Sequence, residues 1–414
     1  MKGRTNLGNG IFLNATTALK IVSGANGITA GDFVQYYTTN PYDELATVTN
    51  EKFHHFKKIG NDYYVVQVGD TILQVLRYTN DVMEIIHTIT STFIVGYVII
   101  DSTHIVVSET RVVKSYEITT NGLTELSSVS VLTSNPNGYS HIDYDSTTNQ
   151  ILLRSYADVY FVHISNEYIL TYSSSTDYLQ LKHNNVVINY NNNGFLENND
   201  YYVMGSNTTG SSSNIYKFVL DLNNHTITSS LVGENAYSSS QEQIYILGDN
   251  FACISKEYNI SSYKLRLRVY SKANLSVVAN NSDAYPIISN FIGTNKFIGI
   301  DTTRKYAIFE FNEANNTFSV LSNIYSEEIS LLMNNASIYA ENGTAFVIAN
   351  MASGSNLKEI ARYLSYNDNY TQITGKTSTD YVERWDGSLD VIGVAKDSGE
   401  SGDTINVYVP SSTY

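Results

Sequence analysis

A repeat in the middle of the sequence constrains the fold more than any other feature. Between residues 53 and 376, groups of four short runs rich in β-branched and aromatic residues recur roughly every 46 residues, and the pattern holds through seven groups. This period is typical of β-propeller blades. A four-stranded blade is apolar on both faces, and only packing around an axis buries both. We therefore predict a seven-bladed propeller over 51–377, with a pair of β-sandwiches or a β-solenoid as the alternative.

The runs themselves indicate strands and give little sign of helix. Pro occurs 4 times and Tyr 34 times, and helical periodicity is hard to find, so we predict an all-β protein. The fourth group is expected to begin with a strand at 186–190. In the third strand of the fifth group, 263–270, Leu265, Leu267 and Val269 would share one face and Lys264, Arg266 and Arg268 the other. In the first group the expected strands are 53–59, 63–68, 71–78 and 83–89.

Charge and hydropathy exclude several classes of partner. The net charge of -15, from 40 acidic and 25 basic residues, disfavours binding to nucleic acid or to an anionic membrane. The longest apolar run, 93–100, is too short to span a bilayer, and the N-terminus lacks the apolar stretch of a signal peptide. We expect a chain made in a cytoplasm, without membrane insertion. Its single cysteine, Cys253, is expected to be a buried, inert thiol.

The last part of the sequence predicts two strands around a Gly-rich connection, within 385–410. A lone hairpin is marginally stable, so these strands need partners. A closed propeller brings residues near 50 and 377 together, and a Gly-Asp turn with an alternating strand lies upstream in 27–37. We infer that both chain ends build one small β-domain, 1–50 plus 378–414, with the propeller inserted into it. Ile405, Val407 and Val409 would face its core, and Gly393 suggests a bulge.

Two segments of this terminal domain resemble known proteins. "ITAGDFVQY" (28–36) and "VIGVAKDSGESGDTINVYVP" (391–410) are similar to short β-modules of bacteriophage virion proteins, which occur in tail, baseplate, fibre and head-decoration proteins, especially of phages of Gram-positive hosts. In those modules the two halves lie close together in the sequence, whereas here the predicted propeller separates them. The resemblance implies a virion role. We expect the assembly module to include Gly31, Asp32, Phe33, Val34, Ile392, Gly393, Val394, Gly402, Asp403, Ile405, Val407 and Val409.

From this resemblance and the predicted organisation we expect a non-enzymatic virion protein, a component of the tail, baseplate or fibre. The terminal module would dock to other virion proteins or to itself, as a homo-oligomer within the particle, and the propeller would be displayed to a polysaccharide or protein of the host surface. Repetition on the particle would strengthen weak contacts through avidity. A head or neck decoration protein, a carbohydrate-degrading propeller enzyme and a cell-surface adhesin remain alternatives.

The sequence shows little that points to catalysis, and we expect no cofactor or metal. His54 and His55 would point to opposite sides of a strand and could not share an ion. The acidic segment 397–403 lacks the ligand spacing of a calcium loop and is expected to be a tight turn. For the glycosidase alternative, the carboxylates at or near strand ends are Asp143, Asp145, Asp301 and Glu341.

Tyrosine-bearing polar segments offer a possible binding surface, because Tyr rings stack and Asn amides hydrogen-bond at low entropic cost. The opposing interpretation is that Tyr replaces Phe at half-buried strand positions. The segments expected to form loops are 36–42, 191–202, 206–216, 237–245 and 366–370.

Overall fold

The computed structural model describes most of the backbone, and only strands, turns and bends occur in the part that it describes. That part comprises residues 4–6, 12–14, 16–22, 27–38, 40–48, 51–120, 122–131, 141–155, 157–173, 176–188, 194–205, 213–236, 241–259, 262–281, 288–293, 295–300, 305–326, 331–353, 356–375, 380–384, 391–400 and 403–409. Within it, no helix has the length and apolar character needed to cross a membrane.

The chain divides into two compact units, which are described separately. One contains Met1–Tyr42 and Lys376–Tyr414, and the other contains Asp43–Gly375. The N-terminal boundary therefore lies earlier than the expected position at 50. The reason is strand β5 (Tyr42–Val48), which pairs with a strand of the last blade.

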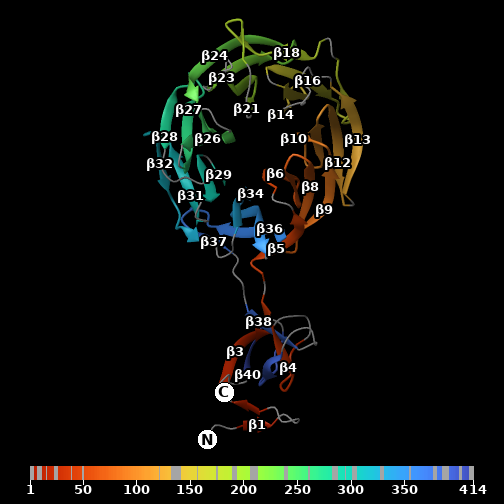
Figure 1. Cartoon of the computed structure of the whole chain (residues 1–414), viewed down its shortest axis with the longest axis vertical. Coiled ribbons are helices and arrows are strands. Elements are labelled where there is room, and N and C mark those ends of the chain that lie inside the picture. The colour runs from red at the N-terminus through yellow and green to blue at the C-terminus, as the bar shows by residue number, and fades with distance from the viewer. Residues whose placement is uncertain are drawn as a thin grey trace. The chain divides into compact units, whose positions relative to one another are not determined.

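The larger unit is a ring of seven antiparallel sheets, counted over the described residues (Figure 1). The first four sheets comprise β6 (Phe53–Ile59), β7 (Tyr63–Val68), β8 (Ile72–Thr79) and β9 (Val82–Thr90); β10 (Ile94–Ile99), β11 (His104–Glu109), β12 (Val112–Thr119) and β13 (Gly122–Ser130); β14 (His141–Asp145), β15 (Gln150–Ser155), β16 (Asp158–Ile164), β17 (Leu170–Thr171) and β18 (Tyr178–Gln180); and β21 (Gly194–Glu197), β22 (Asp200–Gly205), β23 (Ser213–Asp221) and β24 (Thr226–Ala236).

The remaining three sheets complete the ring. They comprise β25 (Gln241–Leu247), β26 (Asn250–Asn259), β27 (Ser262–Ser271) and β28 (Val277–Asn281); β29 (Ile288–Gly293), β30 (Lys296–Ile300), β31 (Lys305–Asn312), β32 (Thr317–Val320) and β33 (Tyr325–Ser326); and β34 (Leu331–Glu341), β35 (Thr344–Ser353), β36 (Asn356–Tyr366) and β37 (Ile373–Gly375), with β5 added to β36.

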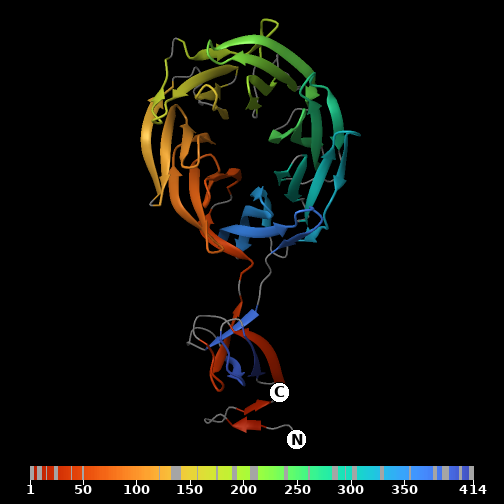
Figure 2. The same cartoon turned by 180° about the vertical axis from the view of Figure 1, so that it is seen from behind.

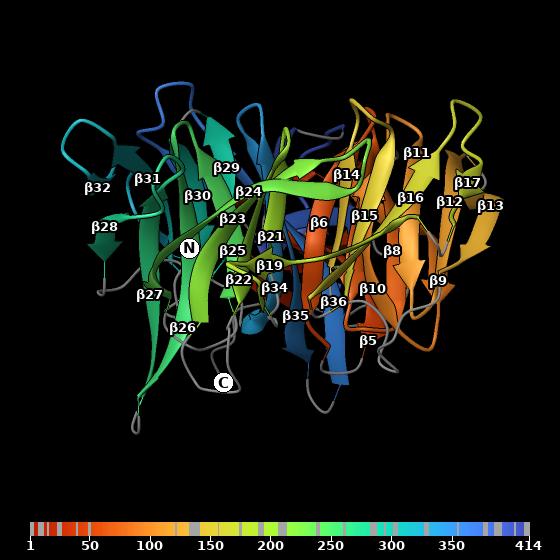
Figure 3. The same ribbon diagram turned by 90° about the horizontal axis from the view of Figure 1, so that it is seen from above.

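In each sheet four strands follow one another in chain order, as expected for a propeller blade, while the additional strands β18, β33 and β5 pair with β16, β31 and β36. Figure 1 shows β6, β10, β14 and β21 on the inner side of the ring and β9 and β13 on its outer side, and Figure 3 shows the same ring edge-on. The protein is therefore an all-β chain with a β-propeller, and the sandwich and solenoid alternatives are wrong.

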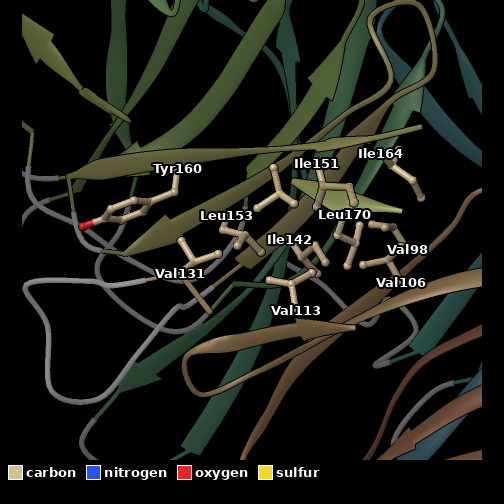
Figure 4. Close-up of a cluster of buried hydrophobic side chains, with 11 residues drawn as sticks. Val98, Val106, Val113, Val131, Ile142, Ile151, Leu153, Tyr160, Ile164 and Leu170 are labelled. Atoms are coloured by element: carbon tan, nitrogen blue, oxygen red, sulfur yellow. The ribbon is translucent and has the colours of Figure 1, made fainter. Parts of the chain in front are cut away.

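Apolar side chains from adjacent blades bury one another. Val98, Val106 and Val113 of the second blade pack with Ile142, Ile151 and Leu153 of the third in one buried cluster (Figure 4). Similar clusters join the first blade to the second and the third to the fourth. This packing between sheets is the arrangement that buries both faces of a blade, at roughly 25 cal/mol for each Å² of apolar surface.

The ring closes by joining its first and last blades. Phe53, Phe56 and Tyr64 of the first blade share a buried cluster with Phe346 and Ile348 of the seventh. Strand β5 reinforces the seam, because Asp43 accepts hydrogen bonds from the Met83 amide (2.7 Å) and from the hydroxyl of Tyr363. Glu44 forms an ion pair with Lys358 across the same pairing, at 2.6 Å. The strand that enters the ring thus completes the blade that ends it.

The smaller unit contains a closed five-stranded barrel built from both chain ends. Its strands, in order around the barrel, are β3 (Thr16–Val22), β38 (Asp380–Arg384), β4 (Phe33–Thr38), β39 (Val391–Ala395) and β40 (Thr404–Val409). Figure 2 shows red N-terminal and blue C-terminal strands together in it. The predicted β-domain of both termini is confirmed.

Two pairs of strands lie apart from these sheets. They are β1 (Arg4–Asn6) with β2 (Phe12–Asn14), and β19 (Lys182–His183) with β20 (Val186–Val187).

One predicted blade strand is wrong. The segment 186–190 was expected to open the fourth blade, but Val186 is exposed in the β19–β20 pair and β21 supplies the inner strand. Strand β21 begins with Gly194, where a Cβ would lie 2.7 Å from the Tyr202 carbonyl oxygen and 3.3 Å from Nη1 of Arg154. The close approach requires glycine, which weakens the local strand signal.

Candidate functional site

The two segments that resemble virion modules meet at one point of the barrel. Ile28 and Gly399 exchange both backbone hydrogen bonds, at 2.8 and 2.9 Å. The Gly31 amide donates to the Ala395 carbonyl at 2.8 Å, and the Ala395 amide donates to the Asp32 carbonyl at 2.9 Å. We call residues 28–32 and 395–399 the terminal clasp. It joins the two ends of the chain through main-chain hydrogen bonds, which do not depend on side-chain identity.

The N-terminal half of the clasp is a tight turn fixed by Asp32. A carboxylate oxygen of Asp32 accepts a hydrogen bond from the Thr29 amide at 2.9 Å, and the Asp32 amide donates to the Thr29 carbonyl at 3.0 Å. Gly31 has a φ of +99°, a backbone conformation that favours glycine. The Ser398 hydroxyl accepts from the Ala30 amide at 2.9 Å, so the second half of the clasp also holds the turn.

The C-terminal half of the clasp continues into a turn held by acidic side chains. Asp403 accepts a hydrogen bond from the Glu400 amide at 2.9 Å. Asp397 accepts from the Asn406 amide at 3.1 Å, and hydrogen bonds from the Asn406 side chain and backbone lower the pKa of the Asp397 carboxyl. The acids are thus used in the turn itself, as the sequence predicts. Residues 401–402, including Gly402, lie outside the described residues.

A small apolar core supports the clasp. It is formed by five buried side chains from both chain ends: Ile28, Val34, Ala395, Ile405 and Val407. Val394 is also buried, whereas Phe33 is 38% exposed. Strand β39 connects the two ends, because Val394 pairs with Phe33 of β4 and with Tyr408 of β40. Ile405 and Val407 therefore face the core as predicted.

The remaining expected module residues lie in paired strands. Gly393 pairs with Val34, and the register shifts between Val391 and Gly393, so Ile392 lies in a bulge. This confirms the bulge predicted from Gly393. Val409 pairs with Thr16 of β3, and its side chain, which was also predicted to face the core, lies outside the described side chains.

Sequence reasoning missed two barrel strands, β3 and β38. Strand β3 pairs with β40 over six residue pairs and with β38 in parallel. Strand β38, with the sequence DYVER, carries three charged residues and a single β-branched one, so it gives little strand signal. The short apolar alternation in TTALKIV was the available signal for β3.

The carboxylates considered for glycosidase chemistry each have neighbours of their own. Asp143 lies 2.9 Å from His141. Asp145 accepts hydrogen bonds from Thr147 and Thr148 in a turn. Glu341 pairs with Lys58 at 3.0 Å, and this hydrogen bond lowers the pKa of its carboxyl, contrary to the need of a general acid. Asp301 lies outside the described residues.

His54 and His55 do not follow the regular strand alternation on which their interpretation rested. The register of β6 against β7 shifts between His54 and Lys57, and His55 has a φ of +49°. The two imidazole rings lie 6.3 Å apart, centroid to centroid. Over the described residues, no group of three or more His, Cys, Asp or Glu side chains is arranged to hold a metal ion. Cys253 lies in β26, outside the described side chains.

The expectation that the tyrosine-bearing segments form loops is wrong for several of their members. Tyr201 and Tyr202 are buried in β22, Tyr216 is buried in β23, and Tyr366 is buried in β36. Tyr36 lies in β4. Residues 191–193, 206–212 and 237–240 lie outside the described residues. The four buried tyrosines therefore act as strand residues that fill space in the propeller.

Comparison with known proteins finds only distant structural similarity. No protein-family model and no curated protein matches the chain. Solved structures that it resembles include Hsv2 of Kluyveromyces lactis (11% identity, 80% of this chain and 99% of that one, TM-score 0.49), the WD40 repeats of RRP9 (9%, 80% and 99%, 0.49) and the C-terminal WD40 domain of Sif2 (11%, 95% and 99%, 0.45). The chain is a β-propeller, as the order of strands in its own sheets shows.

Proposed function

We propose that the chain is a non-enzymatic structural component of a bacteriophage virion. The barrel attaches it to other virion proteins or to a second copy, and the propeller contacts a polysaccharide or protein of the host surface. The observation that carries this proposal is the terminal clasp. The two segments whose sequences resemble virion modules are far apart in the chain, yet they hydrogen-bond to each other from Ile28 to Gly399 and from Gly31 to Ala395.

The clasp explains how such a module can tolerate an insertion. Its contacts are made by backbone groups and by the small buried core that contains Ile28 and Val407. All of these residues belong to the smaller unit. The propeller closes through its own strand β5 and its own aromatic seam. Because each unit is completed by its own residues, the insertion adds a displayed domain without removing a contact from the module.

A tail, baseplate or fibre position is the version of this role that we propose, with host attachment as its purpose. The experiment replaces residues 43–375 by a short Gly/Ser linker in the phage that encodes the chain. The barrel protein should still be found in purified particles by mass spectrometry, and adsorption to host cells should fall.

Other outcomes identify the alternatives. Particles that lack the propeller but adsorb normally would indicate a decoration role on the head or neck. Release of soluble sugar from host wall polysaccharide by the purified full-length chain would indicate an enzyme. Absence of the intact chain from purified particles would overturn the virion assignment.

A further inference from the structure

Two basic side chains on the innermost strand of the first blade are exposed to solvent within the ring. His55 and Lys57 lie on β6, which Figure 1 shows on the inner side of its blade, and both side chains are exposed. The neighbouring residues Phe53, Phe56 and Ile59 are buried between blades. The strand therefore buries its aromatic and aliphatic residues and presents an imidazole and an ammonium group.

A bulge in β6, held by a residue of the next blade, orients these two side chains. His55 is a non-glycine residue with a φ of +49°, at the register shift between His54 and Lys57. The buried hydroxyl of Tyr97, on β10, contacts the carbonyl oxygens of His55 and of Val65, the latter at 2.7 Å. A bulge with a left-handed residue costs energy and re-aims side chains, and such features concentrate at functional positions.

The charges at this position are not balanced within the protein. Lys57 Nζ lies 5.8 Å from the centre of the Tyr97 ring, and over the described residues no carboxylate lies within ion-pair distance of it. Asp143, in the third blade, lies 2.9 Å from His141.

Solvent reaches both side chains, but the protein around them desolvates both groups and lowers the pKa of each. Surrounding protein desolvates His55, and with Lys57, His54 and His141 it lowers the pKa of the imidazole to about 3. Desolvation also lowers the pKa of Lys57, and the charge of Asp143 opposes this only in part. An anion bound beside them would oppose both shifts, because it would stabilise the charged forms of the two groups.

We propose that His55 and Lys57, on the inner side of the first blade, form a binding site for a small anionic group, a phosphate or a carboxylate, with Lys57 as its principal counter-ion. The chain as a whole has a net charge of -15, so this local excess of positive charge is a specific feature and not a property of the surface. The proposal does not rest on the virion role.

The test is calorimetric titration of the full-length protein with inorganic phosphate and, separately, with acetate, at neutral pH and in physiological sodium chloride. Phosphate or acetate should bind saturably. The Lys57→Met variant should weaken binding by about tenfold or more, as expected for loss of a charge-assisted hydrogen bond. Lys57→Arg should retain binding. Lys182→Met, which removes an exposed lysine from β19, is the matched control and should leave binding unchanged.

The two anions distinguish the sources of the ligand. Tighter binding of phosphate would indicate a phosphodiester or phosphoryl group, and tighter binding of acetate would indicate an acidic sugar or peptide. Absence of saturable binding of both anions up to about 10 mM, tenfold above a Kd of about 1 mM, would overturn the proposal. So would equal weakening by Lys57→Met and Lys182→Met.

A second measurement on the wild-type chain does not depend on a variant. The side-chain nitrogen resonances of His55 should move during the titration, and the pKa of its imidazole should rise when the anion is bound. Unchanged His55 resonances with saturating anion would show that any binding occurs elsewhere and would also overturn the proposal.

Discussion

Val34 and Val407 belong to one buried core, although the whole propeller separates them in the chain. Both side chains are inaccessible to solvent, and both pack with Ile28, Ala395 and Ile405. Since the two valines come from opposite ends of the sequence, their contact can form only when both ends are present. The stability of the barrel should therefore depend on each end separately.

Replacement of Val407 by alanine should destabilise the barrel by about 2 kcal/mol, because two methyl groups leave a fully buried site and a small cavity remains. Chemical denaturation followed by a barrel-specific signal, such as tyrosine resonances of β40, measures the effect. Val320→Ala is the matched control, because Val320 is 51% exposed in β32, and it should change the free energy of unfolding by less than about 0.5 kcal/mol. Equal effects of the two variants would contradict the inferred core.

Replacement of Gly31 by valine should also destabilise the barrel, by roughly 1–2 kcal/mol, because a β-branched residue is strained at a φ of +99°. The same denaturation experiment measures this change. Gly31→Asn provides the comparison, since Asn tolerates positive φ better than Val does. If both variants were as stable as the natural chain, the turn of the clasp would not be a constraint on the module.

The blades could be predicted from sequence because their signals are local. In strands β6 and β7, apolar residues alternate with polar ones or follow one another in short runs. The same pattern of four strands repeats along the chain. The module segments were found for a similar reason, because Gly31, Asp32 and Gly393 mark a turn and a bulge at fixed places in short phrases.

The features that sequence reasoning missed depend on partners far away in the chain. Strand β38 is a strand because β3 and β4 flank it, and β5 belongs to the ring because β36 accepts it. The conformation of His55 depends on the hydroxyl of Tyr97 in the next blade. None of these relationships leaves a pattern in the local sequence, because the deciding atoms lie in other strands.

A hydrogen-bonded cluster between the second and third blades gives a further prediction. Asp101 accepts hydrogen bonds from the Tyr168 hydroxyl at 2.7 Å and from His104 at 2.9 Å, and the rings of His104 and Tyr168 stack at 3.4 Å between centroids. Partial burial would raise the pKa of Asp101, but hydrogen bonds from the Thr103 amide, Tyr168 and His104 hold it at about 2.

Tyr168→Phe should therefore raise the pKa of Asp101 toward its ordinary value of 3.8 and cost about 1 kcal/mol at neutral pH. Because the folded pKa lies below the unfolded one, this contribution is present above pH 3.8 and is lost as the pH falls through 2. Carboxyl carbon resonances measure the pKa. Tyr178→Phe, in an exposed pair with Asp158, is the control. An unchanged Asp101 pKa in the Tyr168 variant would exclude the inter-blade hydrogen bond.

The seam between the first and last blades contains a buried acid. Glu359 of β36 is inaccessible to solvent, and one of its carboxyl oxygens accepts a hydrogen bond from the Gln74 side chain of β8 at 3.0 Å. Burial raises the pKa of Glu359 to about 7, although the hydrogen bond from Gln74 opposes the shift. Asn350, its cross-strand neighbour in β35, is also buried. At neutral pH this seam therefore holds a carboxyl group close to its titration point.

The closed ring should consequently lose stability as the pH rises. In the unfolded chain Glu359 ionises near 4.5, so between 4.5 and 7 the folded state holds the extra proton, and unfolding becomes easier as the pH increases through this range. The free energy of unfolding of the propeller should fall by about 3 kcal/mol from this group alone. Glu359→Gln keeps the shape of the side chain without its charge. Between pH 5 and pH 8 the free energy of unfolding of the variant should therefore rise relative to that of the natural chain. Glu313→Gln, at an exposed position, should show no such shift. A pH-independent difference for Glu359→Gln would mean that the seam does not bury an ionisable proton.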